Sequence, residues 1–142
     1  MNDCVFCKII DGQIPSYTIY EDEYVKAFLD ISQATPGHTL VIPKKHVANI
    51  YEYDEELAEK VFSRIPKIAR AIQQSAPDIL GMNIVNNNGE LAYQSVFHSH
   101  FHLIPRYSNK DGFSMTFQDN SEKYNQEAFE QIKSKIINSL EA

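Results

Sequence analysis

The first part of the chain carries short runs of branched and aromatic residues separated by turn-forming residues. These runs span residues 17–20, 24–29 and 39–42, and a Pro36-Gly37 pair precedes the third run. Val, Ile, Thr, Tyr and Phe favour the pleated, half-buried surface of a sheet, whereas Pro-Gly favours a turn. The pattern therefore predicts three strands ahead of the first long helix.

A helical period replaces this pattern over residues 54–75. Asp54 is a good N-cap, and apolar residues then recur every three or four positions on the face that should meet the core. These residues are Leu57, Val61, Ile65, Ile68 and Ile72. Pro66 lies inside the run. Because an interior proline costs about 3 kcal/mol, we expect it to kink the helix or to split it in two.

Two further strands and a final helix complete the pattern. Strands are predicted over 80–85 and 96–104, a polar loop over 108–123, and an amphipathic helix over 126–140. The apolar face of this helix consists of Phe129, Ile132, Ile136 and Leu140. The order of strands, helix, strands and helix predicts an α+β fold, an antiparallel sheet of about five strands with helices packed on it.

The composition excludes several classes of protein. The 142 residues suit a single domain, 1–142, and 13 basic against 19 acidic side chains give a formal net charge of −6. This charge argues against a nucleic-acid partner, although a local pocket can still hold a small anion. We expect no membrane partner and a cytoplasmic location, because the chain shows no apolar run of ~20 residues, no secretory pattern and few cysteines.

The strongest chemical signal is the run His98-Ser99-His100-Phe101-His102. Alternate residues of a strand share one face, so the three imidazoles would line one surface while Phe101 and Leu103 point into the core. Three polar rings on one face are a poor way to build a core, which favours a functional site. Imidazole catalysis and a tri-histidine zinc site both fit the pattern, since His-x-His on a strand is a known zinc geometry.

Several segments together resemble the histidine triad (HIT) family of nucleotide hydrolases and transferases. The alternating histidines followed by two apolar residues are similar to the motif of that family. Residues 28–31 and 36–46 resemble the strand-turn-strand segment that precedes it, and the similarity extends over 4–113. Ser99 departs from the family pattern, which has an apolar residue there, but its side chain should face away from the site.

The resemblance implies a two-step substitution at phosphorus. His100 would attack the α-phosphate and form a nucleotidyl-histidine intermediate, which water then resolves. Attack through Nε2 requires the proton on Nδ1, and the backbone carbonyl of His98 would hold that tautomer. His102 would hydrogen-bond a non-bridging phosphate oxygen, and His38 would help to place the phosphate.

Other side chains are implied to hold the substrate. Gln94 and Ser95 would add neutral donors to the phosphate, and Asn86 stands at a phosphate-contacting position, although Asn86-Asn87-Asn88-Gly89 is also simply a turn. Asp30 would accept from ribose hydroxyls, with a solvated strand-end aspartate as an equal alternative. The apolar candidates for the base pocket, each of which fits the core as well, are Phe6, Ile9, Phe28 and Ile31.

The Cys4-Val5-Phe6-Cys7 segment has the spacing of half a tetrahedral zinc site. No third cysteine exists, so the remaining ligands would be histidines, and His46 and His98 are the best candidates. This set resembles the structural zinc of some branches of the family, which would anchor the strand beside the nucleophile. Two buried thiols are the main alternative, whereas a redox pair would need a βαβ context that the sequence lacks.

The expected activity is hydrolysis or transfer of a nucleoside monophosphate, AMP first of all, from a phosphoramidate or a dinucleoside polyphosphate. Pro105-Arg106 resembles the polyphosphate branch of the family and residues 37–46 the phosphoramidase branch, so both substrates stay open. A nucleotide sensor with little turnover and a zinc hydrolase with the histidine run as ligands are the alternatives. The resemblance also implies a homodimer whose sheet continues across a two-fold axis.

Overall fold

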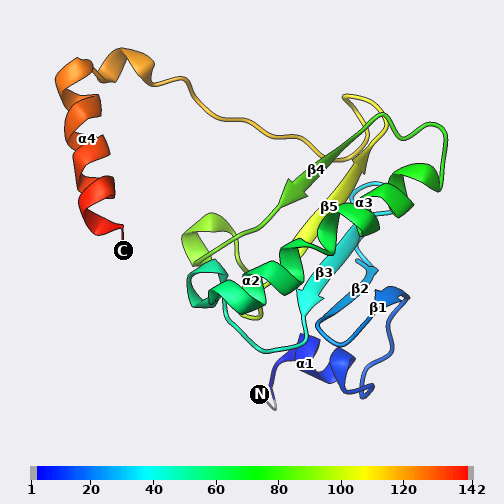
Figure 1. Cartoon of the computed structure of the whole chain (residues 1–142). Coiled ribbons are helices and arrows are strands. Elements are labelled where there is room, and N and C mark those ends of the chain that lie inside the picture. The colour runs from blue at the N-terminus through cyan, green and yellow to red at the C-terminus, as the bar shows by residue number, and fades with distance from the viewer. Residues whose placement is uncertain (1–2, 141–142) are drawn as a thin grey trace.

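The computed structural model describes residues 3–140, so both ends of the predicted domain, residues 1–2 and 141–142, lie outside the described residues. Its centre is a five-stranded antiparallel sheet with the order β1-β2-β3-β5-β4 (Figure 1). The strands are β1 Thr18–Glu21, β2 Val25–Leu29, β3 Thr39–Pro43, β4 Gly81–Val85 and β5 Phe101–Arg106. The α+β prediction is confirmed.

The strand predicted over 96–104 is wrong at its start. β5 begins at Phe101, and the residues before it leave the ladder because their polar groups bond to other segments. The Ser99 amide donates to the carbonyl oxygen of Val47 at 2.7 Å, and the Ser99 hydroxyl lies 2.8 Å from the Tyr53 hydroxyl. Ser99 therefore faces away from the cavity described below, as expected.

The long predicted helix is split in two. α2 spans Glu55–Phe62 and α3 spans Ile65–Gln74. Pro66 lies in the first turn of α3, where a helix has no use for the missing N–H. The predicted effect of the proline is thus confirmed, and the apolar stripe continues through both helices.

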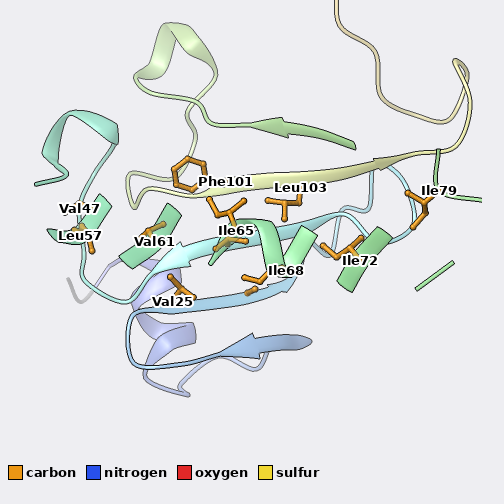
Figure 2. Packing of buried hydrophobic residues seen from close by; sticks show 12 residues of the cluster. Val25, Val47, Leu57, Val61, Ile65, Ile68, Ile72, Ile79, Phe101 and Leu103 are labelled. Atoms are coloured by element: carbon orange, nitrogen blue, oxygen red, sulfur yellow. The ribbon is translucent and has the colours of Figure 1, made fainter. Parts of the chain in front are cut away.

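The sheet has a different cover on each face. α2 and α3 bury one face, where Val61, Ile65 and Ile68 pack with Val25, Phe101 and Leu103 (Figure 2). The other face carries Phe28, Leu40 and Ile42 and is covered by α1, a short helix over Val5–Ile10 that buries Phe6 and Ile9. The sequence patterns had not predicted α1.

The C-terminal helix is correct in extent but not in its packing. α4 spans Gln126–Ser139 and stands apart from the sheet at the end of an extended segment (Figure 1). Its predicted apolar face, Phe129, Ile132, Ile136 and Leu140, is between 43% and 72% exposed. Amphipathic spacing predicts that a face is covered without saying by what. In the part of the chain that is described, no helix has the length and apolar character to cross a membrane.

Candidate active site and metal cluster

Two histidines of the run reach the α1 side of the sheet around the start of β5. The register pairs Leu40 with His102, so His102 shares its face with the α1 cluster. His100 lies immediately before the strand and is only 6% exposed. Its ring meets the edge of Phe6, with ring centroids 5.1 Å apart and an interplanar angle of 80°. Phe101 and Leu103 are in the opposite core, as expected.

A backbone carbonyl determines where His100 carries its proton. His100 Nδ1 lies 2.8 Å from the carbonyl oxygen of His98. Because a carbonyl oxygen only accepts, Nδ1 must donate, and the neutral ring then has its lone pair on Nε2. This is the tautomer that a nucleophilic imidazole needs for attack through Nε2.

A second backbone group determines the tautomer of His102 through His38. The Ala34 amide donates to His38 Nδ1 at 3.2 Å, so neutral His38 carries its proton on Nε2. His38 Nε2 lies 2.9 Å from His102 Nδ1, which must therefore accept. His102 is left with its proton on Nε2, as a donor. His100 and His102 are thus held in opposite tautomers, one with a free lone pair and one with a free N–H.

The position of His38 depends on the turn before β3. Gly37 has a φ of +97°, a conformation that favours glycine, and a Cβ at this residue would come within 3.1 Å of the Pro105 side chain. The His38 amide closes the turn by donating to the Thr35 carbonyl oxygen at 3.1 Å. The predicted Pro36-Gly37 turn is confirmed, and its role is to aim His38 at His102.

Burial keeps these imidazoles uncharged. Loss of solvation lowers the pKa of His38 and of His100 below its ordinary value. Burial, together with the neighbouring His100 and His38, lowers the pKa of His102 to about 4. Asp30 opposes the effect, with Oδ2 3.6 Å from His38 Nε2, but does not outweigh it. The rings are therefore neutral at pH 7.

The rings of His100 and His102 form the polar end of a cavity of about 320 Å³ between α1 and the sheet. Its lining is largely apolar and includes all four predicted base-pocket residues. Phe6, Ile9 and Phe28 are at once buried core and cavity wall, whereas Ile31 is 87% exposed at the rim. A cavity of this size suits a small ligand with one apolar part and a few polar groups.

Besides His102, two of the predicted substrate-binding residues lie at this cavity. Ser95 and Asp30 both line it. Asp30 Oδ1 accepts from the Ser32 amide at 2.8 Å, which holds the carboxylate in place while Oδ2 faces His38. A carboxylate held this way can accept hydrogen bonds from ribose hydroxyls.

The side chains of Gln94 and Asn86 instead bond the backbone around the cavity. Gln94 accepts from the Gly89 amide at 2.8 Å and donates to the carbonyl oxygens of Ala48 and Val96 at 2.6 and 3.0 Å. Asn86 Nδ2 donates to the His100 carbonyl oxygen at 2.9 Å. The two amides therefore hold the segment that carries Ser95 and His100.

The four predicted metal ligands converge on one point beside the cavity. Cys4 is the N-cap of α1 and Cys7 lies one turn later, so the helix brings both thiols together. His46 follows β3 and His98 precedes β5. The ligand atoms of Cys4, Cys7, His46 and His98 all lie within 4.8 Å of one another.

The spacing of these atoms fits a tetrahedral cation. Zinc bonds of about 2.0–2.3 Å place neighbouring ligand atoms about 3.3–3.8 Å apart. The His98 Nδ1 atom lies 3.1 Å from His46 Nδ1, 3.4 Å from Cys4 Sγ and 3.6 Å from Cys7 Sγ, and Cys7 Sγ lies 3.3 Å from His46 Nδ1. His98 Nε2 donates to the Pro43 carbonyl oxygen at 2.8 Å, which turns the Nδ1 lone pair toward the cluster.

The cluster also separates the alternatives that the sequence left open. His98 belongs with the cysteines, whereas His100 and His102 belong to the cavity, so the run does not form one tri-histidine metal site. Burial and the neighbouring Cys4 raise the pKa of the Cys7 thiol to about 11. A redox pair needs the opposite shift, toward a reactive thiolate.

Sequence patterns could not find some parts of the site. The Ala34 amide and the Pro43 carbonyl are backbone groups, for which side-chain identity carries no signal. Val5 and Leu40 line the cavity but show only the apolar character of core residues. The Cys4 cap followed by an apolar run was the one signal for α1.

The fold and the two neutral histidines define a class of α+β proteins in which a pair of imidazoles lies at the start of an interior strand of the sheet, here β5. Residues 11–109 match the model of the HIT domain, and the chain belongs to this family. It is 54% identical over 138 residues to Protein hit of Bacillus subtilis, covering 97% of this chain and 94% of that protein. It is also 39% identical over 109 residues to adenosine 5′-monophosphoramidase of Saccharomyces cerevisiae, covering 77% of this chain and 66% of that protein.

Solved structures agree with the fold. The crystal structure of a HIT family member from Bacillus subtilis is 53% identical, has a TM-score of 0.94 and covers 99% of both chains. A Zn-bound histidine triad family protein from Mycobacterium smegmatis is 37% identical, has a TM-score of 0.73 and covers 94% of this chain and 98% of that one.

Proposed function

We propose that this protein hydrolyses nucleoside 5′-phosphoramidates through a covalent nucleotidyl intermediate on His100. Nucleotide hydrolysis is supported at the level of the family. The observation that carries the proposal is the pair of opposite tautomers, His100 with its lone pair on Nε2 and His102 with its proton on Nε2, at the end of one apolar cavity. This chemistry needs a nucleophile and a group that donates a hydrogen bond to the phosphate oxygens.

The reaction proceeds in two displacements. In the first, His100 Nε2 forms a bond to the α-phosphorus while the phosphorus–nitrogen bond of the substrate breaks, and the departing amine takes a proton from solvent. In the second, water forms a new bond to phosphorus, the bond to Nε2 breaks, and the proton of the water returns to solvent. His102 donates Nε2–H to a non-bridging oxygen, and the His98 carbonyl accepts from His100 Nδ1 while that ring is positively charged.

The charge of the cavity favours a substrate with one phosphate over a polyphosphate. The lining residues within the described chain include no lysine or arginine, and their one carboxylate is Asp30. Arg106 belongs to the Pro105-Arg106 pair that resembles the polyphosphate branch, but its side chain bonds to residues outside the cavity lining. It donates to Asp111 at 3.0 Å and to Asn83 at 2.7 Å. A polyphosphate chain would find no side-chain cation there to offset its charge. The named activity of the yeast relative supports the same choice.

The remaining site residues have supporting roles in this proposal. Asp30 binds the ribose hydroxyls and Ser95 donates to the phosphate, both from the cavity lining. Gln94 and Asn86 hold the surrounding backbone. The cluster of Cys4, Cys7, His46 and His98 holds zinc, which would supply a structural crosslink between α1 and the ends of two central strands. The solved Zn-bound relative supports this assignment.

The test compares the wild-type protein with His100→Asn on adenosine 5′-phosphoramidate and a diadenosine polyphosphate. We expect wild type to prefer the phosphoramidate in kcat/KM, and His100→Asn to lose about 1,000-fold or more in kcat, since nothing else can take the nucleophile's place. The Kd for AMP should change little, because the pocket remains.

Three results would contradict the proposal. A variant that keeps more than about a tenth of the wild-type rate would remove His100 from its role. A preference for the polyphosphate would refute the substrate class. Tight AMP binding by wild type without turnover would instead support the sensor alternative.

A further inference from the structure

Asp30 and His38 face each other just beyond the paired part of β2 and β3. The last register pair of these strands is Leu29 with Thr39, so Asp30 and His38 are the next pair along the ladder. The Asp30 amide donates to the His38 carbonyl oxygen at 3.0 Å, as it would in a continuing antiparallel ladder. Two residues of the candidate site therefore lie where regular strand pairing ends.

The second backbone hydrogen bond of this pair is missing. Opposite residues in a hydrogen-bonded antiparallel pair exchange two N–H···O bonds. The His38 amide instead donates to the Thr35 carbonyl oxygen at 3.1 Å, which closes the turn before β3. The Asp30 carbonyl oxygen thus loses its ladder donor, and one backbone bond is left to hold the pair.

The side chain of Gln33 replaces the missing bond. Its Nε2 donates to the Asp30 carbonyl oxygen at 2.6 Å and to the His38 carbonyl oxygen at 2.7 Å. Its Oε1 accepts from the Gly37 amide at 2.8 Å, so both amide protons and the amide oxygen are used inside one turn. Among the described residues, no other side chain hydrogen-bonds the backbone carbonyls of both Asp30 and His38.

Other contacts hold the middle of the turn but not its two ends. The Thr35 hydroxyl donates to the Pro105 carbonyl oxygen at 2.6 Å. The Tyr107 hydroxyl donates to the Pro36 carbonyl oxygen. These bonds attach the turn to β5 and to the residue after it. The Gln33 side chain is exposed and lies outside the hydrophobic core, so its removal should leave the fold intact and change the turn locally.

We propose that Gln33 is a positioning residue that fixes Asp30 relative to His38 and thereby sets the preference for ribose over deoxyribose. The inference rests on the proposed function, in which Asp30 binds the ribose hydroxyls while His38 orients His102. With the Gln33 bridge in place, Asp30 Oδ2 lies 3.6 Å from His38 Nε2. Without the bridge, the carboxylate can shift, and a hydrogen bond to the 2′-hydroxyl depends on its position far more than apolar contacts with the base do.

The test compares Gln33→Met with Gln73→Met in the full-length protein. Methionine keeps the length of the side chain and removes the amide, and Gln73 is an exposed residue of α3 that controls for the same exchange away from the site. Calorimetry gives the Kd of each protein for AMP and for 2′-deoxy-AMP, and thermal unfolding gives its Tm. Binding needs no turnover, so a wild type that binds AMP without hydrolysing the phosphoramidate would count against the proposed function alone.

We expect wild type and Gln73→Met to bind AMP at least about tenfold more tightly than 2′-deoxy-AMP, and Gln33→Met to bring this ratio below about threefold. The loss should come from weaker binding of AMP, because 2′-deoxy-AMP lacks the hydroxyl concerned. A Gln33→Met protein that keeps the wild-type ratio would overturn the proposal, even if its Tm falls, since the amide would then only stabilise the turn. A wild type that binds both nucleotides equally would overturn it as well.

Discussion

The pKa values of the neutral imidazoles at the cavity should determine how the reaction responds to pH. His102 accepts from His38 at Nδ1 only while it is unprotonated there. Burial lowers the pKa of His102 to about 4 and that of His38 below 6.5. Protonation, which breaks the arrangement, is therefore delayed to acidic pH.

We predict that kcat/KM for adenosine 5′-phosphoramidate stays level between about pH 8 and 6.5 and declines only below the ordinary histidine pKa. Stability should follow the same sign. Between the ordinary pKa and the lowered one, the unfolded chain binds protons that folded His102 does not, so the free energy of unfolding decreases as pH falls through this window. Rate and urea-unfolding profiles across pH measure both effects.

The control is His38→Ala, which removes the hydrogen bond to His102 and should alter the acid limb of the rate profile. The spontaneous hydrolysis of the substrate in acid is subtracted at each pH. A wild-type midpoint above pH 7 would contradict the neutral network described here.

At this scale the sequence predicted which histidines gather at the cavity better than it predicted which groups the neighbouring side-chain amides contact. The alternating histidines identified His100 and His102, because their spacing is a side-chain pattern. The contacts of Gln94 and Asn86 with the surrounding backbone depend on where loops come together in space, which no local pattern reports.

At the scale of elements, a helix or strand was easier to predict where its hydrophobic pattern was long and where a residue such as proline marked its boundary. The period through α2 and α3 is long, and Pro66 has a defined steric effect, so the two helices and their break were predictable. α1 is six residues long, too short to show a period, and is stabilised by the Cys4 cap and by burial of Phe6 and Ile9 against the sheet. The position at which β5 begins depends on hydrogen bonds that the preceding residues make to remote loops.

The Cys4/Cys7/His46/His98 cluster joins three elements, and its removal should therefore affect stability first. We predict about one zinc per chain and a Cys4→Ser variant whose Tm falls more than its kcat does, since a closed four-ligand site has no open position for water. Elemental analysis and thermal unfolding of the two proteins measure this. Lys8→Ala, on the same short helix but outside the ligand set, is the matched control.

Two observations would refute the structural zinc. One is metal-free protein after purification without chelators. The other is a Cys4→Ser variant that keeps its Tm but loses its turnover, which would make the cluster part of the chemistry.

At the scale of the whole molecule, we expect charge and cavity size to select the substrate. A net charge of −6 would repel a long polyanion, while a cavity of about 320 Å³ would admit one nucleotide. The position of α4 is the part of the molecule that the sequence could least predict, because the apolar stripe requires a cover but does not name it.

We predict that small purine nucleotides are substrates and RNA is not. The apolar wall around Phe6 and Phe28 accepts a purine by burial with little discrimination between bases. Adenosine and guanosine phosphoramidates should therefore differ by less than about tenfold in kcat/KM, or ~1.4 kcal/mol. A panel of these compounds and a short RNA tests this, and RNA that is bound or cleaved better than the nucleotides would contradict it.

The most direct test of the central claim is the mass of the protein during turnover. Wild type mixed with excess adenosine 5′-phosphoramidate and quenched within milliseconds, without acid, should gain the mass of one adenylyl group. Peptide mapping should place that group on His100, and His100→Asn should show no adduct. An adduct on another residue, or steady turnover by wild type with no adduct at any quench time, would contradict nucleophilic attack by His100.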